Sequence, residues 1–514
     1  MAERLDDLLA AAARNDPGRA AILAEGRGTD FAELDRRVTA VAAAITELLP
    51  EPGGTVAAVS VLHPDFAVAY YGTVRAGGVV AVVNPLLRED DLVHLLVSSG
   101  AALAFVDAVV LRRLAAVRDR LPAALRLIVI GADPAADQSS VTTLDDLAAG
   151  TSTAGGSAAG FVPPPVSPDD VACIQFTSGT TGRPKAVRLT HRNLLVNAEQ
   201  IADAHRLDRG SVTLNHLPTF HPMHLNSALR AGATQVLFAG PDPAEAVAAA
   251  NRYGATHYYS LPVRLARLAV DPALDGLELR TVRRIASGGS ALPVAAAVRL
   301  TERFGVPVFQ GYGLAETSPL THSDDPEHPT PGSVGRPVAG TECRVVDIES
   351  RSVLVPGEVG EVQLRGPQVM KGYLGGPDGT GLEADGWLST GDAGRIDAEG
   401  RLFLVDRLKD VFKCDNFLVA PSDVERVLLA HPLVREAVVV DLPDPFSGSV
   451  AGALLVLSGG ADSLDQVLSA VNEQLPYYQR VRHAKAVDAV PRNGNGKIQR
   501  RVLAAGLAEE LAAV

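Results

Sequence analysis

Cysteine, long apolar runs and runs of basic residues are all scarce in this chain of 514 residues. Its three cysteines, Cys173, Cys343 and Cys414, lie far apart, without a Cys-x-x-Cys pair or a histidine at ligand spacing, which argues against a disulfide scaffold and a structural zinc site. No window offers the roughly 18 uninterrupted apolar residues that a membrane span requires, and residues 1–17 lack the apolar segment of a signal peptide. We therefore expect a cytoplasmic protein in a reducing compartment.

The charge balance argues against nucleic acid as a partner. Lysine and arginine total 47 and aspartate and glutamate total 60, so the formal net charge is −13. No long basic run is present to follow a phosphate backbone. The length exceeds what one hydrophobic core normally supports, so we expect two or more domains.

Short β-rich runs alternate with alanine-rich stretches of helical length in the first part of the chain. Strands are expected at 56–61, 79–83, 103–106 and 127–130, and helices at 31–49 and 64–75. This alternation is typical of wound α/β sheets. A second α/β series is expected over 193–313, and a β-rich region punctuated by glycine turns over 341–404.

The pattern restarts after Arg407. Helices are expected at 422–430 and 464–474 and strands at 436–441 and 453–457, which is enough for a small α+β domain. Its boundary is expected near Asp406 to Asp410. The Gly, Ala, Ser and Pro-rich segment 148–165 is interpreted as a flexible connector within the larger domain.

A run of glycines and hydroxyl residues follows the apolar stretch 171–174 and ends at one lysine. It reads Phe-Thr-Ser-Gly-Thr-Thr-Gly-Arg-Pro-Lys, and its candidate phosphate ligands are Thr177, Ser178, Gly179, Thr180, Thr181, Gly182 and Lys185. The spacing departs from the Walker loop, because Pro184 precedes the lysine and Ala186 follows it in place of a metal-binding hydroxyl. The segment therefore predicts a different cradle for ATP, the alternative being a surface loop rich in turn formers.

Five further motifs follow this cradle in order. They are Ala-Ser-Gly-Gly-Ser-Ala-Leu-Pro at 286–293, Gln-Gly-Tyr-Gly-Leu-Ala-Glu-Thr-Ser-Pro at 310–319, Gly-Trp-Leu-Ser-Thr-Gly-Asp at 386–392, Asp-Arg-Leu-Lys-Asp at 406–410 and Pro-Arg-Asn-Gly-Asn-Gly-Lys at 491–497. Together they closely resemble the adenylate-forming superfamily of acyl-CoA synthetases, aryl-CoA ligases, peptide-synthetase adenylation domains and beetle luciferases. The resemblance implies a large adenylating domain over 1–407 and a small mobile domain over 408–514.

The residue chemistry of these motifs suits a magnesium nucleotide. The ring of Tyr312 can lie against adenine, and Glu316 offers the oxygen ligand that Mg²⁺ prefers, a role the resemblance also implies. Asp392 can accept hydrogen bonds from the ribose hydroxyls, and Arg407 can bridge ribose and phosphate. The remaining residues predicted to bind the nucleotide are Gly289, Ser290, Gln310 and Gly311.

The resemblance also assigns two lysines of the smaller domain and a pocket for the acid. It implies that Lys497 stabilises charge developing during adenylation and that Lys409 is the hinge between two half-reactions. A lysine at this hinge position resembles the pattern of the coumarate ligase and luciferase branch of the superfamily. The predicted acid pocket contains His221, Met223, Ser227 and Gly313, with His224, Tyr258, Tyr259 and Ser290 as further candidates for its wall.

Three departures from the superfamily pattern bear on the reaction. After Ser227, roughly four residues of a pocket-wall helix are missing. Ala315 replaces the threonine that usually bonds the α-phosphate, a loss of about 1.5–3 kcal/mol. Asp415 and Asn416 stand where the coumarate ligase branch has lysine and glycine in the CoA channel, which reverses one charge and adds a side chain, although asparagine tolerates positive φ as glycine does.

Three functions follow as alternatives. The first is ATP-dependent activation of an aromatic or arylacrylic acid as an acyl adenylate, followed by transfer to CoA. The second keeps the adenylation but uses another acceptor, such as a carrier protein, an amine or nitrite in a diazotisation. The third is a non-catalytic nucleotide-binding relative, which the presence of Lys185, Glu316, Asp392, Arg407 and Lys497 disfavours.

Overall fold

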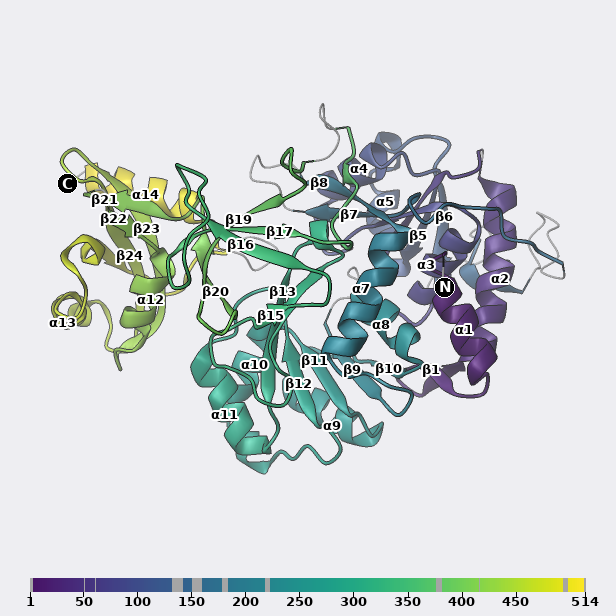
Figure 1. Ribbon diagram of the computed structural model, residues 1–514, viewed down its shortest axis with the longest axis horizontal. Helices are drawn as coiled ribbons and strands as arrows, with labels where there is room; N and C mark the ends of the chain where they lie inside the picture. Colours follow the sequence, from purple (N-terminus) through teal and green to yellow (C-terminus); the bar gives the residue numbers. More distant parts are fainter. Residues whose placement is uncertain are drawn as a thin grey trace. The chain divides into compact units, whose positions relative to one another are not determined.

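The chain forms two compact units in the computed structural model (Figure 1). One unit consists of Met1–Glu342 and Leu364–Leu388, and the other of Cys343–Gln363 and Ser389–Val514. The structure describes residues 3–49, 51–60, 62–131, 142–149, 160–177, 184–217, 222–375, 381–415, 417–492 and 498–512.

A seven-stranded sheet of the first unit carries the two ends of the predicted cradle on adjacent strands. Its strand order is β18-β8-β7-β4-β3-β5-β6; β7, β4, β3, β5 and β6 run parallel, β8 is antiparallel to β7, and β18 is antiparallel to β8. The parallel strands are valine and alanine-rich and mostly buried, as expected where helices cover both faces. The strands are β3 (Thr55–Val59), β4 (Val79–Val82), β5 (Leu103–Asp107), β6 (Arg126–Ile130), β7 (Val171–Thr177), β8 (Lys185–Thr190) and β18 (Gly372–Tyr373).

A nine-stranded sheet forms the other half of this unit, in the order β15-β14-β13-β12-β11-β9-β10-β1-β2. Its strands are β1 (Ala20–Ala24), β2 (Arg27–Asp30), β9 (Val212–His216), β10 (Thr234–Leu237), β11 (His257–Ser260), β12 (Arg284–Ser287), β13 (Val308–Gly313), β14 (Leu320–Ser323) and β15 (Arg336–Pro337). The strands from β1 to β13 in this order run parallel, so the carboxyl ends of β11, β12 and β13 meet at one edge.

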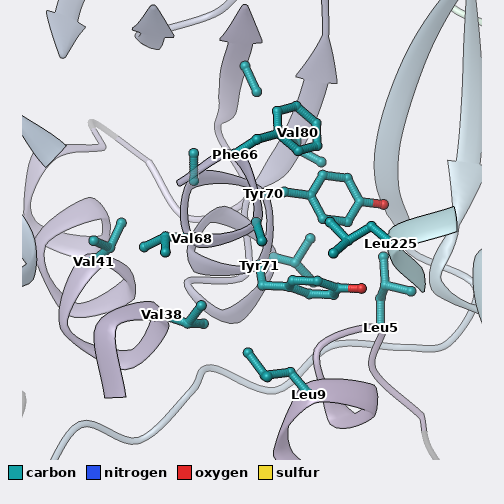
Figure 2. Close-up of a cluster of buried hydrophobic side chains, with 14 of the residues drawn as sticks. Leu5, Leu9, Val38, Val41, Phe66, Val68, Tyr70, Tyr71, Val80 and Leu225 are labelled. Carbon is teal, nitrogen blue, oxygen red and sulfur yellow. The ribbon is translucent and has the colours of Figure 1, made fainter. Parts of the chain in front are cut away.

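Helices of the first unit pack on these sheets. They are α1 (Asp7–Asn15), α2 (Phe31–Leu48), α3 (Phe66–Arg75), α4 (Glu89–Ser98), α5 (Ala108–Ala115), α6 (Leu144–Ala148), α7 (His191–Ala204), α8 (Met223–Ala231), α9 (Pro243–Arg252), α10 (Pro262–Ala269) and α11 (Val294–Phe304). All ten residues of α3 are buried; the helix is mostly apolar, and its buried Thr73 and Arg75 have polar partners within the unit. Figure 2 shows Tyr70 and Tyr71 of α3 among Leu5, Leu9 and Leu225. The hydroxyl of Tyr71 donates to Oδ1 of Asn226 in α8 at 2.6 Å, so the polar end of this buried ring is satisfied.

The second unit contains a four-stranded sheet, β16-β17-β19-β20, most of whose residues belong to this unit, and a smaller α+β part. In the α+β part, β24 pairs with β21, β23 and β25, and α12, α13 and α14 accompany this sheet. The elements are β16 (Glu342–Val346), β17 (Gly360–Arg365), β19 (Leu388–Ile396), β20 (Leu402–Arg407), β21 (Phe412–Cys414), β22 (Phe417–Val419), α12 (Pro421–Leu429), β23 (Val434–Asp444), β24 (Gly448–Leu457), α13 (Leu464–Asn472), β25 (Val481–Ala486) and α14 (Arg500–Ala512).

The predicted fold class is confirmed: the chain is mixed α/β, with a large N-terminal domain of several sheets and a small C-terminal domain. The compact units divide the chain differently from the predicted boundary, because residues 343–363 and 389–407 cluster with the C-terminal part. The division at 407 and 408 therefore stays a prediction. Among the described residues, no helix combines the length and apolar character needed to cross a membrane.

Candidate active site

The two ends of the predicted phosphate cradle lie on paired strands. Strands β7 and β8 are antiparallel, and Thr177 lies opposite Lys185 in their register. The hairpin therefore brings the first and last candidate ligands of the cradle together. The other candidate ligands between them, Ser178, Gly179, Thr180, Thr181 and Gly182, lie outside the described residues.

Tyr373 joins Lys185 to Glu316, although the sequence motifs did not indicate it as a site residue. Its hydroxyl donates to Oε1 of Glu316 at 2.9 Å, and the Nζ of Lys185 lies 4.8 Å from the centroid of its ring. Burial, and then the neighbouring Glu316 carboxylate, raise the pKa of Tyr373, so its hydroxyl is protonated at neutral pH and acts as the donor. The predicted phosphate lysine and the predicted metal ligand are thus brought to the two ends of one side chain.

Glu316 lies in a single helical turn, Ala315–Thr317, that follows β13. The backbone carbonyl of Glu316 accepts the N–H of Met370 at 2.8 Å, three residues before Tyr373. The fully buried Thr317 accepts the N–H of Leu314, which closes the turn. Glu316 is itself partly exposed, so its carboxylate is accessible from a fixed backbone.

The segment predicted to cover adenine follows the end of β12. Ser287, the last residue of β12, is opposite Gln310 of β13. Oε1 of Gln310 accepts the N–H of Leu292 at 2.7 Å, so this side chain fixes the loop that contains Gly289 and Ser290. Gly289 has φ of +94°, a conformation that side chains rarely adopt, which gives a backbone reason for glycine here.

The glycines around Tyr312 have a packing role. A Cβ on Gly313 would lie 1.8 Å from the carbonyl oxygen of Pro319, and one on Gly311 would lie 2.9 Å from Leu320. Both glycines therefore permit the close approach of β13 and β14. Tyr312 itself is only 8% exposed, with its ring 5.9 Å from that of His322, so little more than an edge of it is available to a ligand.

Asp392 and Arg407 form an ion pair within the second unit. They are opposite each other on the antiparallel strands β19 and β20, with Nε of Arg407 2.8 Å from Oδ1 of Asp392. The side chain of Asp392 is 7% exposed and that of Arg407 is 51% exposed. A guanidinium oriented by a buried carboxylate can still donate outward to a ribose or a phosphate.

Of the two predicted lysines of the smaller domain, the structure describes one. Lys409 is exposed in the turn after β20, where the N–H of Leu408 donates to the carbonyl oxygen of Gly391 at 2.9 Å. Lys497 lies outside the described residues.

A small pocket lies beside the N-terminus of α8, where the sequence predicted the acid-binding wall. It is lined by Asn215, Leu217, Pro222, His224, Leu225, Gln235 and Leu237. Met223 is partly exposed at the first turn of α8, whereas Ser227 is fully buried and donates to the carbonyl oxygen of His224 at 3.3 Å. His221 lies outside the described residues. Asn215 and Gln235 were missed, and the signal for them was two amides in otherwise buried strands.

His224 also belongs to a buried aromatic stack. Its ring lies 4.1 Å from that of Tyr259, whose hydroxyl is 3.1 Å from Nδ1 of His205. Burial, with His224 and His257 adding to it, holds the pKa of His205 well below its ordinary value. His205 is therefore uncharged at neutral pH and contributes to packing and hydrogen bonding.

The residues present fit magnesium bound together with a nucleotide. Among the described residues, no group of three or more His, Cys, Asp or Glu side chains surrounds a common point. Mg²⁺ commonly uses only one or two carboxylates when substrate phosphates supply its other ligands. Glu316, beside Lys185 and the cradle hairpin, offers that carboxylate.

Comparison with known proteins gives the class. Residues 9–374 match the family described as AMP-binding enzyme, and residues 423–497 match the AMP-binding enzyme C-terminal domain. A 4-coumarate–CoA ligase 2 from Oryza sativa subsp. japonica is 32% identical over 511 residues, which cover 94% of this chain and 89% of that protein. Together with the site, these matches define an ATP-dependent, adenylate-forming ligase. The chain belongs to the AMP-binding enzyme family.

Solved structures of related enzymes are similar to this chain over almost its whole length. The anthranilate CoA ligase AuaEII in complex with anthranoyl-AMP superposes with a TM-score of 0.88 at 25% identity, covering 99% of this chain and 98% of that one. The amide bond synthetase McbA from Marinactinospora thermotolerans superposes with a TM-score of 0.85 at 26% identity, covering 97% and 99%. The predicted superfamily and the predicted use of ATP are therefore confirmed.

Proposed function

We propose that this enzyme activates an aromatic or arylacrylic carboxylic acid as its acyl adenylate, releases pyrophosphate, and transfers the acyl group to CoA. The observation that carries the adenylation is the juxtaposition of Lys185 and Glu316 at Tyr373, beside the cradle hairpin. A cation and an anion so placed suit a triphosphate with its metal. The acid and the acceptor are inferred from relatives named for 4-coumarate, anthranilate and CoA.

In the first step, a carboxylate oxygen of the acid forms a bond to the α-phosphorus of ATP while the bond to the pyrophosphate oxygen breaks. Lys185 holds the departing phosphates, Asp392 and Arg407 hold the ribose, and Lys497 stabilises charge developing at the α-phosphate. A bound Mg²⁺ supplies positive charge to the phosphates, and Glu316 is the residue that would hold it. In the second step, the thiol of CoA attacks the acyl carbon, its proton passes to solvent, and AMP leaves with the former carboxylate oxygen.

The test is pyrophosphate release from ATP over a panel of benzoic, cinnamic and aliphatic acids, with and without CoA. We expect release that depends on an aromatic acid, together with a thioester and AMP when CoA is present. Mixtures without acid give the background. Absence of acid-dependent release with every acid would refute adenylation, and release without any thioester would refute CoA as the acceptor.

A second acceptor class is favoured by the hairpin of β21 and β22. Asp415 is exposed in its turn with φ of +49°, and its N–H donates to the carbonyl oxygen of Ser447 at 3.0 Å. An anion here opposes the phosphates of CoA and does not oppose a cationic amine. McbA, named as an amide bond synthetase, is a structural neighbour. An amide product in the same acid panel, formed with added amines but not with CoA, would support this alternative.

Arg407→Ala is expected to weaken ATP binding roughly tenfold, because one charge-assisted hydrogen bond is removed from the ribose or phosphate. The midpoint of thermal unfolding is expected to fall by a few degrees as well, because the substitution removes one partner of the buried Asp392 carboxylate. Calorimetric titration with ATP gives the affinity. Arg426→Ala is the matched control, since Arg426 is 74% exposed in the same unit and pairs with Asp423 at 3.5 Å. Unchanged ATP affinity in Arg407→Ala would contradict the assignment.

A further inference from the structure

Tyr373 has two separate contacts with groups of opposite charge. Its hydroxyl donates to Oε1 of Glu316, and its ring face lies beside the ammonium of Lys185. No ion pair joins Lys185 to Glu316 among the residues that the structure describes. A tyrosine side chain, apolar at its ring and polar at its end, thus takes the position that a direct ion pair would otherwise occupy.

A direct pair between these two groups would oppose nucleotide binding. Each partner would be neutralised by the other, and both would have to separate before phosphates and metal bound. Tyr373 contacts both groups without cancelling either charge. A carboxylate oxygen has more than one lone pair, so Oε1 can accept the hydroxyl while the carboxylate remains able to bind a cation.

The backbone around Tyr373 fixes its position. Strand β18 pairs with β8 so that Tyr373 is opposite Val187, two residues from Lys185. The N–H groups of Lys371 and Leu374 donate to the carbonyl oxygens of Arg188 and Ala186. Gly381 approaches the ring so closely that a Cβ there would lie 2.6 Å from it. The position of the Tyr373 ring is therefore set by the backbone pairing of β18 and by close packing against Gly381.

We propose that Tyr373 is a positioning residue for ATP activation, which holds the cation of Lys185 and the carboxylate of Glu316 apart and aims both at the triphosphate and its metal. This inference rests on the proposed function, because it takes the phosphate role of Lys185 and the metal role of Glu316 from there. The ring acts through Lys185 and the hydroxyl acts through Glu316. The two contacts are consequently separable by substitution.

Tyr373→Phe keeps the ring and removes the hydroxyl, and Tyr373→Leu removes both contacts. In calorimetric titrations of the full chain, we expect Tyr373→Phe to bind ATP in EDTA as the wild type does, but to bind ATP in excess Mg²⁺ roughly 3- to 10-fold more weakly. Tyr373→Leu is expected also to lose about 2- to 5-fold in the titration with EDTA. In kinetics, the Mg²⁺ concentration for half-maximal pyrophosphate release is expected to rise in Tyr373→Phe by the same factor.

Two controls separate positioning from folding. Tyr71→Phe removes a buried hydroxyl bond of 2.6 Å elsewhere in the same unit, so it should lower the thermal midpoint without changing the Mg²⁺ dependence. In a Glu316→Gln background, adding Tyr373→Phe should change the Mg²⁺ dependence less than twofold, because the hydroxyl acts through the carboxylate.

An unchanged Mg²⁺ dependence in Tyr373→Phe, or an undiminished effect in the Glu316→Gln background, would overturn the proposal. Wild-type pyrophosphate release is measured in parallel. A wild type that releases none refutes the proposed function, whereas normal wild-type release with an unaltered Tyr373→Phe refutes the role of Tyr373 alone.

Discussion

Lys497→Ala is expected to lower acid-dependent pyrophosphate release at least about 100-fold while ATP affinity stays within about threefold. The reason is the stage of the reaction at which the positive charge of Lys497 acts. A cation that contacts the α-phosphate only as negative charge develops contributes to the transition state and little to the bound ground state. Removal of one such electrostatic group typically costs about 10²–10³ in rate. Single-turnover pyrophosphate release and calorimetric ATP titration measure the two quantities separately.

Two other lysines of the same unit provide controls. Lys485 is exposed and bonds both carboxylate oxygens of Glu510 at 2.6 Å, so Lys485→Ala removes an equal charge that lies outside the motif and should leave the release rate unchanged. Lys409→Ala, at the proposed hinge, should leave pyrophosphate release intact while slowing transfer to the acceptor. A fully active Lys497→Ala, or a loss of ATP affinity equal to its loss of rate, would show that Lys497 is not the adenylation lysine.

The backbone elements that could be predicted were those with strong local patterns. The strand expected at 79–83 is β4 at Val79–Val82, and the helix expected at 31–49 is α2 at Phe31–Leu48, capped by Asp30. The strand follows from a short apolar, β-branched run, and the helix follows from apolar periodicity and a standard N-cap; neither needs knowledge of distant residues. The division into units did not follow such a pattern, because residues 343–363 cluster with a segment that begins at Ser389.

The sequence could indicate a candidate site residue whose role rests on its own motif. It could not indicate a residue whose role depends on a contact between two distant segments. Glu316 and Lys185 stand in recognisable motifs. Tyr373 stands in a Lys-Gly-Tyr-Leu stretch without an evident chemical signature, 57 residues from the carboxylate that it bonds. That contact depends on β18 pairing with β8, which only tertiary structure supplies. The stacking of the Tyr259 ring on His224 likewise depends on tertiary structure.

Gly313, a predicted pocket residue, also has a role in the packing of the chain. The sequence motif predicts this glycine in the acid pocket. The structure adds that a Cβ there would collide with the backbone of Pro319 at 1.8 Å, because β13 and β14 turn back on each other at this point. Glycine is therefore required by the chain whether or not a substrate lies beside it.

Arg75→Met is expected to destabilise the first unit by about 3–5 kcal/mol, which lowers its thermal midpoint by roughly 5–10 °C. Arg75, the last residue of α3, is 5% exposed. It pairs with Asp6 at 3.0 Å and with Asp35 at 2.8 Å, and donates to Oγ1 of Thr39 at 2.7 Å. Methionine retains much of the aliphatic length but leaves the buried Asp6 with one guanidinium fewer. Circular dichroism during heating measures the midpoint.

Arg36→Met is the matched control, because Arg36 also pairs with a carboxylate at 2.8 Å, that of Glu33, but is 59% exposed. Its midpoint should change by about 1 °C or less. If the cost arises from the carboxylate left behind, adding Asp6→Asn to Arg75→Met should recover part of the loss, whereas additive losses would place the cost in packing. The effect should also reach the predicted acid pocket, since Tyr71 of the same helix bonds Asn226 in α8, and the N-terminus of α8 borders the small cavity at that position. In Arg75→Met we therefore expect a larger rise in the KM for the acid than in the KM for ATP.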